Sequence, residues 1–135
     1  MSDLRGFSDA TLTPEQVRQL SPASWAYLGD AVYELYVRRF YLMPPKRSQL
    51  YHRQVVNQVR AESQARHLDA LASHLTPAEL EIVRLGRNAT FRRPKRIDAE
   101  TYQKATSLEA LLGYLYLTDR PRLEELLGHL DLEID

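Results

Sequence analysis

This chain lacks several features, and each absence excludes a class of protein. It has no cysteine, so a disulfide framework is not available to it. No apolar run approaches the ~20 residues of a membrane span, and no apolar stretch follows a basic flank near the start, as it does in a secretion signal. We therefore expect a cytoplasmic protein without a membrane partner.

The motifs of several common enzyme classes are also missing. The chain contains no glycine-rich phosphate loop, and its four histidines are scattered rather than clustered at zinc spacing. Ser24 and Ser107 have no histidine at a motif spacing, so a serine hydrolase triad has no support. The candidates that remain for chemistry are carboxylates and basic side chains.

A net charge of zero hides a strong separation of charge along the chain. Between Arg38 and Arg96 there are 13 lysines or arginines against 4 acids, a net charge of +9, and the two ends together carry −9. A basic middle between acidic ends indicates a polyanion partner for one surface of the protein. The alternative is a solvated surface whose charges pair with one another.

Helix-start signals and the lack of alternating apolar residues predict an all-α fold. We expect residues 1–135 to form a single domain, with residues 1–10 disordered. The expected helices are Pro14–Leu20, Pro22 to about Leu42, one or two within Lys46–Leu75 with a possible break at Asn57, Pro77 to about Gly86, a body Tyr102–Leu117 capped by Asp98, and Arg122–Leu130. The core positions expected within Lys46–Leu75 are Leu50, Val55, Val56, Val59, Leu68 and Leu71.

The segment Ala23–Phe40 places the carboxylate of Asp30 in the middle of a helix that is apolar nearly all round. On a helical wheel, Asp30 lies almost opposite a wide apolar stripe. The stripe consists of Trp25, Leu28, Val32, Leu35 and Tyr36. A helix that is apolar on both sides is normally buried on both sides, so we expect Asp30 to be buried and to need a cation, a donor or a ligand.

A second acid, Glu109, lies in the other strongly apolar helix, on a stripe with Ala105, Thr106 and Gly113. Asp30 has the small residue Gly29 beside it. Small residues let two helix backbones approach closely, so these two helices would bring their acids together. Two convergent carboxylates form a hard-oxygen site of the kind that Mg²⁺ or Mn²⁺ prefers.

Each acid also has a structural interpretation. A buried carboxylate often accepts hydrogen bonds from the backbone or from a tyrosine, and Tyr33, Tyr102 and Tyr116 are candidate donors. Glu34 lies one helical turn after Asp30, and it either reaches the same cleft or pairs with Arg38 four residues on.

The segment Arg87–Arg96 has the composition of a basic loop, with a proline inside it and no apolar period. Six arginines or lysines lie between Arg84 and Arg96, which favours contact with an anion. The structural alternative is a mobile surface loop.

Three segments carry a resemblance to a known family. They are Ala26–Glu34 (AYLGDAVYE), Gly86–Ala89 (GRNA) and Glu109–Leu117 (EALLGYLYL). The first resembles the signature helix of the ribonuclease III family, and Thr106–Gly113 resembles its second acidic segment. Together, and in this order, the three segments resemble the Mini-ribonuclease III subfamily of bacteria and plastids.

The resemblance implies an all-helical endonuclease domain that forms a homodimer and cleaves double-stranded RNA with Mg²⁺, for which Mn²⁺ is a possible substitute, without a separate RNA-binding domain. It implies that Asp30 and Glu109 are the catalytic, metal-binding acids. Ala26 and Thr106 stand where the larger family has two further acids, so the number of metal ions stays open. The implied substrate is precursor ribosomal RNA, especially the 23S precursor.

Basic residues are expected to contact the RNA backbone, because A-form RNA offers phosphates more readily than base edges. The expected contact residues are Arg84, Arg87, Asn88, Arg92, Arg93, Lys95, Arg96, Lys46, Arg47 and Arg53. Two other interpretations remain. One is an inactive module that binds double-stranded RNA or assists assembly, and the other is a structural helical protein whose central helices form a dimer core.

Overall fold

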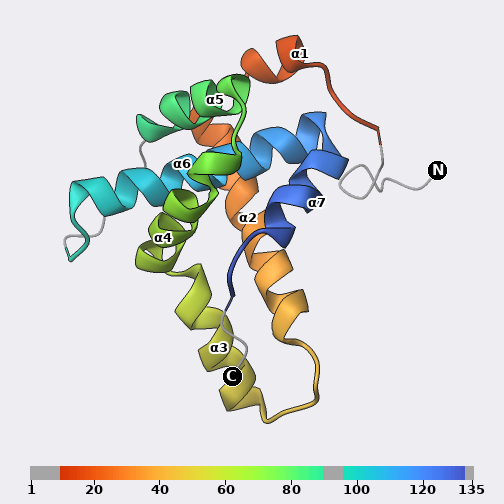
Figure 1. Cartoon of the computed structure of the whole chain (residues 1–135), viewed down its shortest axis with the longest axis vertical. Helices are drawn as coiled ribbons and strands as arrows, with labels where there is room; N and C mark the ends of the chain where they lie inside the picture. The colour runs from red at the N-terminus through yellow and green to blue at the C-terminus, as the bar shows by residue number, and fades with distance from the viewer. Residues whose placement is uncertain (1–9, 90–95, 133–135) are drawn as a thin grey trace.

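A computed structural model of the chain describes residues 10–89 and 96–132, and these residues form helices without any strand (Figure 1). The helices are α1 (Pro14–Arg18), α2 (Pro22–Tyr41), α3 (Ser48–Val59), α4 (Ala61–Leu71), the 3₁₀ turn η2 (Ala72–His74), α5 (Pro77–Arg87), α6 (Ala99–Thr118) and α7 (Arg120–Gly128). The predicted all-α class is confirmed. The expected disorder of residues 1–10 falls almost wholly outside the described residues.

Most helices begin where their capping residues predict. Thr13, Ser21, Thr76, Asp98 and Asp119 each accept a hydrogen bond from the backbone N–H three residues on. These caps satisfy N–H groups that have no partner within the helix. Three boundaries differ from the prediction by two residues: α1 ends at Arg18 rather than near Leu20, α7 begins at Arg120 because Asp119 caps it, and α7 ends at Gly128 rather than Leu130.

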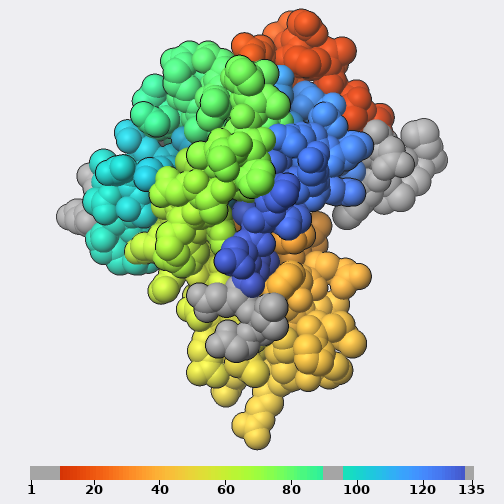
Figure 2. Space-filling model, in the orientation of Figure 1, coloured from red at the N-terminus to blue at the C-terminus, as the bar shows by residue number. Residues whose placement is uncertain are grey.

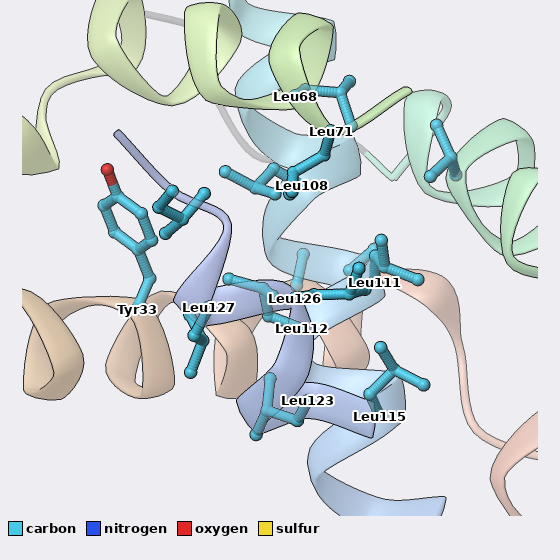
Figure 3. Packing of buried hydrophobic residues seen from close by; sticks show 14 of the residues in the cluster. Tyr33, Leu68, Leu71, Leu108, Leu111, Leu112, Leu115, Leu123, Leu126 and Leu127 are labelled. Carbon is cyan, nitrogen blue, oxygen red and sulfur yellow. The ribbon is translucent and has the colours of Figure 1, made fainter. Parts of the chain in front are cut away.

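Helix α6 lies at the centre of the molecule, and α2, α4, α5 and α7 pack around it (Figure 1). Leu108, Leu111 and Leu112 of α6 are fully buried, and they belong to one apolar cluster with leucines of α4 and α7 and with Tyr33 of α2 (Figure 3). A helix enclosed by four others needs apolar side chains on all its sides. This position explains why its sequence is apolar all round.

The helical conformation is interrupted at Arg60, between α3 and α4, three residues after the predicted position Asn57. Arg60 has an extended backbone, which leaves the last carbonyl groups of α3 without helical partners. The Tyr33 hydroxyl donates to the Gln58 carbonyl at 2.6 Å, and the Gln64 amide donates to the Val59 carbonyl at 2.9 Å. These tertiary hydrogen bonds hold the break where it is.

The predicted core positions in α3 and α4 are partly wrong. Leu50 and Val56 are 39% and 42% exposed, whereas Val55, Leu68 and Leu71 are buried as expected. Val59 is partly buried against the core. Helix α3 packs chiefly against the C-terminal half of α2, and Figure 2 shows these two segments projecting below the rest of the molecule. A helix covered on one side buries fewer residues than its apolar pattern suggests.

A membrane-spanning helix would have to be longer and more apolar than any found in residues 10–89 and 96–132.

Candidate active site

Two glycines bring the backbones of α2 and α6 into contact. A Cβ atom added to Gly29 would lie 1.7 Å from the Glu109 carbonyl oxygen, and one added to Gly113 would lie 1.9 Å from the Trp25 carbonyl oxygen. Real atoms do not approach so closely, so each position admits a glycine alone unless the helices move apart. The close approach predicted from the small residues is confirmed.

The close approach places the two acids together. Asp30 follows Gly29 on α2, and Glu109 lies one turn before Gly113 on α6. Burial raises the pKa of the Glu109 carboxyl to about 8, and the neighbouring Asp30 charge adds to this, since the two side chains are within hydrogen-bonding reach. Two carboxyl groups in contact cannot both carry a charge at low cost without a cation. The sequence prediction that the acids converge is therefore confirmed.

Asp30 itself is exposed, so the prediction that it is buried is wrong for the single chain. Ala26, Gly29 and Tyr33 take the buried face of α2, and Asp30 lies at the edge of that face. The acid lines an open cavity of about 450 Å³ whose other lining residues are Tyr27, Ala31, Glu34, Leu35 and Arg38. The Asp30 carboxylate is accessible to a substrate from this side.

Tyr33 and Glu34, which the structural interpretation placed near Asp30, have other partners. Glu34 pairs with Arg38, whose Nε lies 2.9 Å from Glu34 Oε2. The Tyr33 hydroxyl donates to the carbonyl of Gln58, on α3. Tyr33 is therefore not the hydrogen-bond donor to Asp30, and Glu34 forms the predicted pair with Arg38.

Glu109 lines a second cavity, of about 200 Å³, which lies between the end of α3, the start of α4 and the first half of α6. Gln64 and Thr106 also line it. The Thr106 hydroxyl donates to the carbonyl of Tyr102 at 2.9 Å. Sequence reasoning missed Gln64, because a glutamine near the start of a helix is usually exposed, whereas this one is 2% exposed.

The donor set fits a hard divalent cation such as Mg²⁺ or Mn²⁺ better than an ion that prefers nitrogen or sulfur ligands, such as Zn²⁺. Within the described residues there is no group of three or more histidine, cysteine, aspartate or glutamate side chains that could hold a metal. Asp30 and Glu109 offer two carboxylates, and Mg²⁺ is commonly held by one or two carboxylates with water and substrate phosphate. The contact between the two acids and the buried amide oxygen of Gln64, which has no partner in the described part of the chain, both suit a cation.

Several basic residues predicted to contact RNA are engaged within the protein. Arg84 binds Glu81 through Nε at 2.9 Å and through Nη2 at 2.5 Å. Lys46 donates from Nζ to the Tyr41 carbonyl at 2.6 Å and so ties the end of α2 to the segment leading into α3. These contacts within the protein hold both side chains and compete with a contact to RNA.

Other basic residues stand exposed. Arg47 is the N-cap of α3, Arg53 lies on α3, Arg87 ends α5, and Asn88 follows it as the C-cap. Arg96 lies 3.9 Å from Glu62 and is also exposed. The predicted contacts Arg92, Arg93 and Lys95 lie outside the described residues.

The sequence of this chain matches known proteins over most of its length. The family described as "Ribonuclease III domain" matches residues 23–120. Proteins named "Mini-ribonuclease 3" are similar to it: that of Synechocystis is 56% identical and the match covers 86% of this chain and 81% of that protein. The Thermosynechococcus vestitus protein is 54% identical, with 87% and 80% covered, and the Staphylococcus aureus protein is 38% identical, with 83% and 87% covered.

The fold is also similar to that of a solved structure. A crystal structure of a Fusobacterium nucleatum protein superposes with a TM-score of 0.76 at 26% sequence identity. The match covers 83% of this chain and 93% of that one. The arrangement of helices around α6 therefore occurs in a protein whose sequence has diverged widely from this one.

Proposed function

Because the chain belongs to the ribonuclease III family and is an endoribonuclease that acts on double-stranded RNA, we propose that it cleaves the RNA at a Mg²⁺ centre held by Asp30 and Glu109. Mn²⁺ is the expected substitute. The contact between the two carboxyl groups, one exposed and one partly buried, carries this proposal.

Hydrolysis of a phosphodiester needs an activated water and neutralisation of charge on the phosphorus, and a carboxylate-held Mg²⁺ supplies both. The residues of this chain do the positioning. Glu109 is held by the packing of α6, and Asp30 is set beside it by Gly29. Asp30 is exposed at the edge of the buried face of α2, so its carboxylate is accessible to a cation and to a phosphate. Two acids fixed by closely packed helices would align a bound phosphate without rearrangement.

The decisive experiment replaces Asp30 with asparagine, which removes one charge but keeps the shape. We expect Asp30→Asn to lose duplex cleavage at every Mg²⁺ concentration while it folds and binds RNA as before. Glu34→Gln is the matched control, because Glu34 lines the same cavity but pairs with Arg38. Cleavage by Asp30→Asn at saturating Mg²⁺ would refute the assignment, and RNA binding without any cleavage by the unaltered protein would favour an inactive binding module.

We infer that exposed basic residues on α3 and at the end of α5 contact the phosphate backbone. Arg47, Arg53 and Arg87 support this, since they are exposed and have no ion pair within the described residues. In the sequence, Asn88 and a further basic segment directly follow Arg87, and we include both in the proposed contact. Arg84 and Lys46 remain candidates, although Glu81 offsets the charge of Arg84 and a hydrogen bond to the Tyr41 carbonyl holds the Lys46 ammonium group.

We also propose that two copies of the chain form the active enzyme. On α2, Tyr27 and Leu35 are 76% and 66% exposed, and Ala31 lies between them on the same stripe. An apolar stripe beside a catalytic acid is a poor surface to leave in water, whereas a second copy would cover it. Two centres related by a two-fold axis would cut both strands of a duplex.

Precursor 23S ribosomal RNA is the proposed natural substrate, and the cytoplasm the proposed location. Support for both comes from membership of the family and from the resemblance of the three sequence segments to its reduced subfamily. Sequencing the ends of 23S ribosomal RNA in cells that lack the protein tests this substrate. Unchanged ends would exclude it without affecting the proposed chemistry.

A further inference from the structure

Gln64 lies in the first turns of α4 and is almost completely buried, with 2% of its surface exposed. Its Nε2 donates to the carbonyl of Val59, the last residue of α3, at 2.9 Å. This hydrogen bond crosses the break between α3 and α4. The amide is therefore held in one place by both helices.

The other end of this amide is unsatisfied. Gln64 Oε1 is buried and accepts no hydrogen bond from any described residue. Leaving a buried acceptor unpaired costs about 1–3 kcal/mol, and such groups commonly mark the place of a water or an ion. An oxygen that is fixed, buried and unpaired is a candidate ligand.

The surroundings of Gln64 point to the same conclusion. The side chain lines the 200 Å³ cavity together with Glu109, and its amide nitrogen donates toward the Glu109 carboxyl, which opposes the rise in the pKa of that acid. At roughly 30 Å³ for each water molecule, the cavity has room for a hydrated ion.

Mg²⁺ and Mn²⁺ accept neutral amide oxygens as well as carboxylates. We propose that Gln64 Oε1 is a third protein oxygen of the divalent-cation centre, beside Asp30 and Glu109. This inference rests on the proposed metal centre and adds a residue to it. The amide oxygen adds a ligand without adding negative charge to the two acids.

The test measures Mn²⁺ binding to the RNA-free protein by electron paramagnetic resonance of the free ion, so that it does not depend on cleavage. Gln64→Met removes the oxygen at nearly constant volume, and Gln64→Glu keeps an oxygen at the position. Gln58→Met is the matched control, since Gln58 is 3% exposed in the same region but its Oε1 lies 3.0 Å from His67 Nε2. Asp30→Asn tests the metal centre itself, and circular dichroism verifies folding of each variant.

We expect the dissociation constant for Mn²⁺ to rise about tenfold in Gln64→Met, to stay within about twofold of the unaltered protein in Gln58→Met, and not to rise in Gln64→Glu, as expected for hard oxygen ligands. An unchanged constant in Gln64→Met would overturn the role of Gln64. If Gln64→Met does not fold, Gln64→Glu decides, because weaker binding in that variant contradicts the proposal. Undiminished binding by Asp30→Asn would instead refute the metal centre.

Discussion

At the scale of single residues, Gly29 and Gly113 set the distance between the acids. Both lie where a methyl group would strike a carbonyl oxygen of the opposite helix, at 1.7 and 1.9 Å. The same pair of glycines thus provides the packing and positions the site. Substitution should affect stability and catalysis together.

We predict that Gly29→Ala destabilises the protein by about 3 kcal/mol or more, since α2 and α6 must separate to admit the added carbon. Thermal unfolding measures the loss, and any folded fraction should cleave RNA poorly because Asp30 moves away from Glu109. Gly128→Ala is the control, because its added Cβ has no atom within 4 Å. A Gly29→Ala protein as stable and active as the unaltered one would contradict the role of the close approach.

Residue-level features differ in how far the sequence could predict them. The meeting of Asp30 and Glu109 was predictable, because small residues at helical spacing mark helices in close contact. The exposure of Asp30 was not predictable, because a helical wheel does not show which side of an apolar helix the other helices of the same chain cover. Gln64 was missed because its burial depends on how the start of α4 packs against the end of α3 and against α6, which a local sequence pattern does not show.

At the scale of elements, an ion pair joins α5 to α7. Arg122 donates from Nε to Glu79 Oε2 at 2.8 Å and from Nη2 to Glu79 Oε1 at 2.9 Å, and the two side chains are 19% and 10% exposed. Glu79 also closes the capping box of α5, where it accepts from the Thr76 N–H. One carboxylate therefore fixes the start of α5 and its contact with α7.

We predict that Glu79→Gln lowers the free energy of unfolding at neutral pH by about 1.5–3 kcal/mol, the range for hydrogen bonds to charged groups. The hydrogen bonds from Arg122 lower the pKa of Glu79 below its usual value of 4.5. The folded state thus favours the ionised form, so the stabilisation is complete above pH 4.5 and is lost as the pH falls through the lower pKa of the folded state. Urea unfolding across this range should show the variant and the unaltered protein converging in acid.

Glu81→Gln provides the control for this prediction. Glu81 pairs with Arg84 on the same helix, but both side chains are substantially exposed. An exposed pair contributes little to stability. If the two substitutions have equal effects, or if the effect of Glu79→Gln does not shrink in acid, the ion pair between α5 and α7 does not stabilise the fold as argued.

The elements themselves show where local signals suffice. The helix starts followed from capping residues and prolines, and those signals act within four residues. The break at Arg60 and the exposure of Leu50 depend on what α2 and α4 do in space. Propensity and periodicity contain no information about such contacts.

At the scale of the whole molecule, the exposed stripe of α2 predicts the oligomeric state. We expect Leu35→Glu to convert the proposed homodimer to a monomer that still folds, because Leu35 is already 66% exposed in the single chain. Sedimentation at micromolar concentration measures the change. Leu80→Glu should leave the dimer intact, since Leu80 lies on α5 at 46% exposure and away from the stripe. A monomeric but fully active unaltered protein would contradict the two-copy arrangement.

RNA binding also belongs to the whole molecule, because it depends on charges spread over several elements. We predict that replacing Arg87, Arg92 and Arg93 together with glutamine weakens duplex binding and reduces its salt dependence. The slope of log affinity against log salt should fall by roughly 0.7–0.9 for each phosphate that the variant no longer neutralises, if the rule for DNA and single strands applies to duplex RNA. Cleavage at saturating RNA should slow far less than in Asp30→Asn, because the acids are unchanged.

Arg84→Gln is the control for these arginines, since Glu81 already neutralises much of the Arg84 charge through two hydrogen bonds. If each of the three arginines binds one phosphate, each accounts for about a third of the effect of the triple substitution. Arg84→Gln should change the RNA affinity and the salt slope by less than that third. An equal or larger effect of Arg84→Gln would mean that Arg87, Arg92 and Arg93 are not the main phosphate contacts. Unchanged affinity with reduced turnover in the triple variant would mean that these arginines act in the chemical step, and that RNA is held by Arg47, Arg53 and the rest of the basic surface.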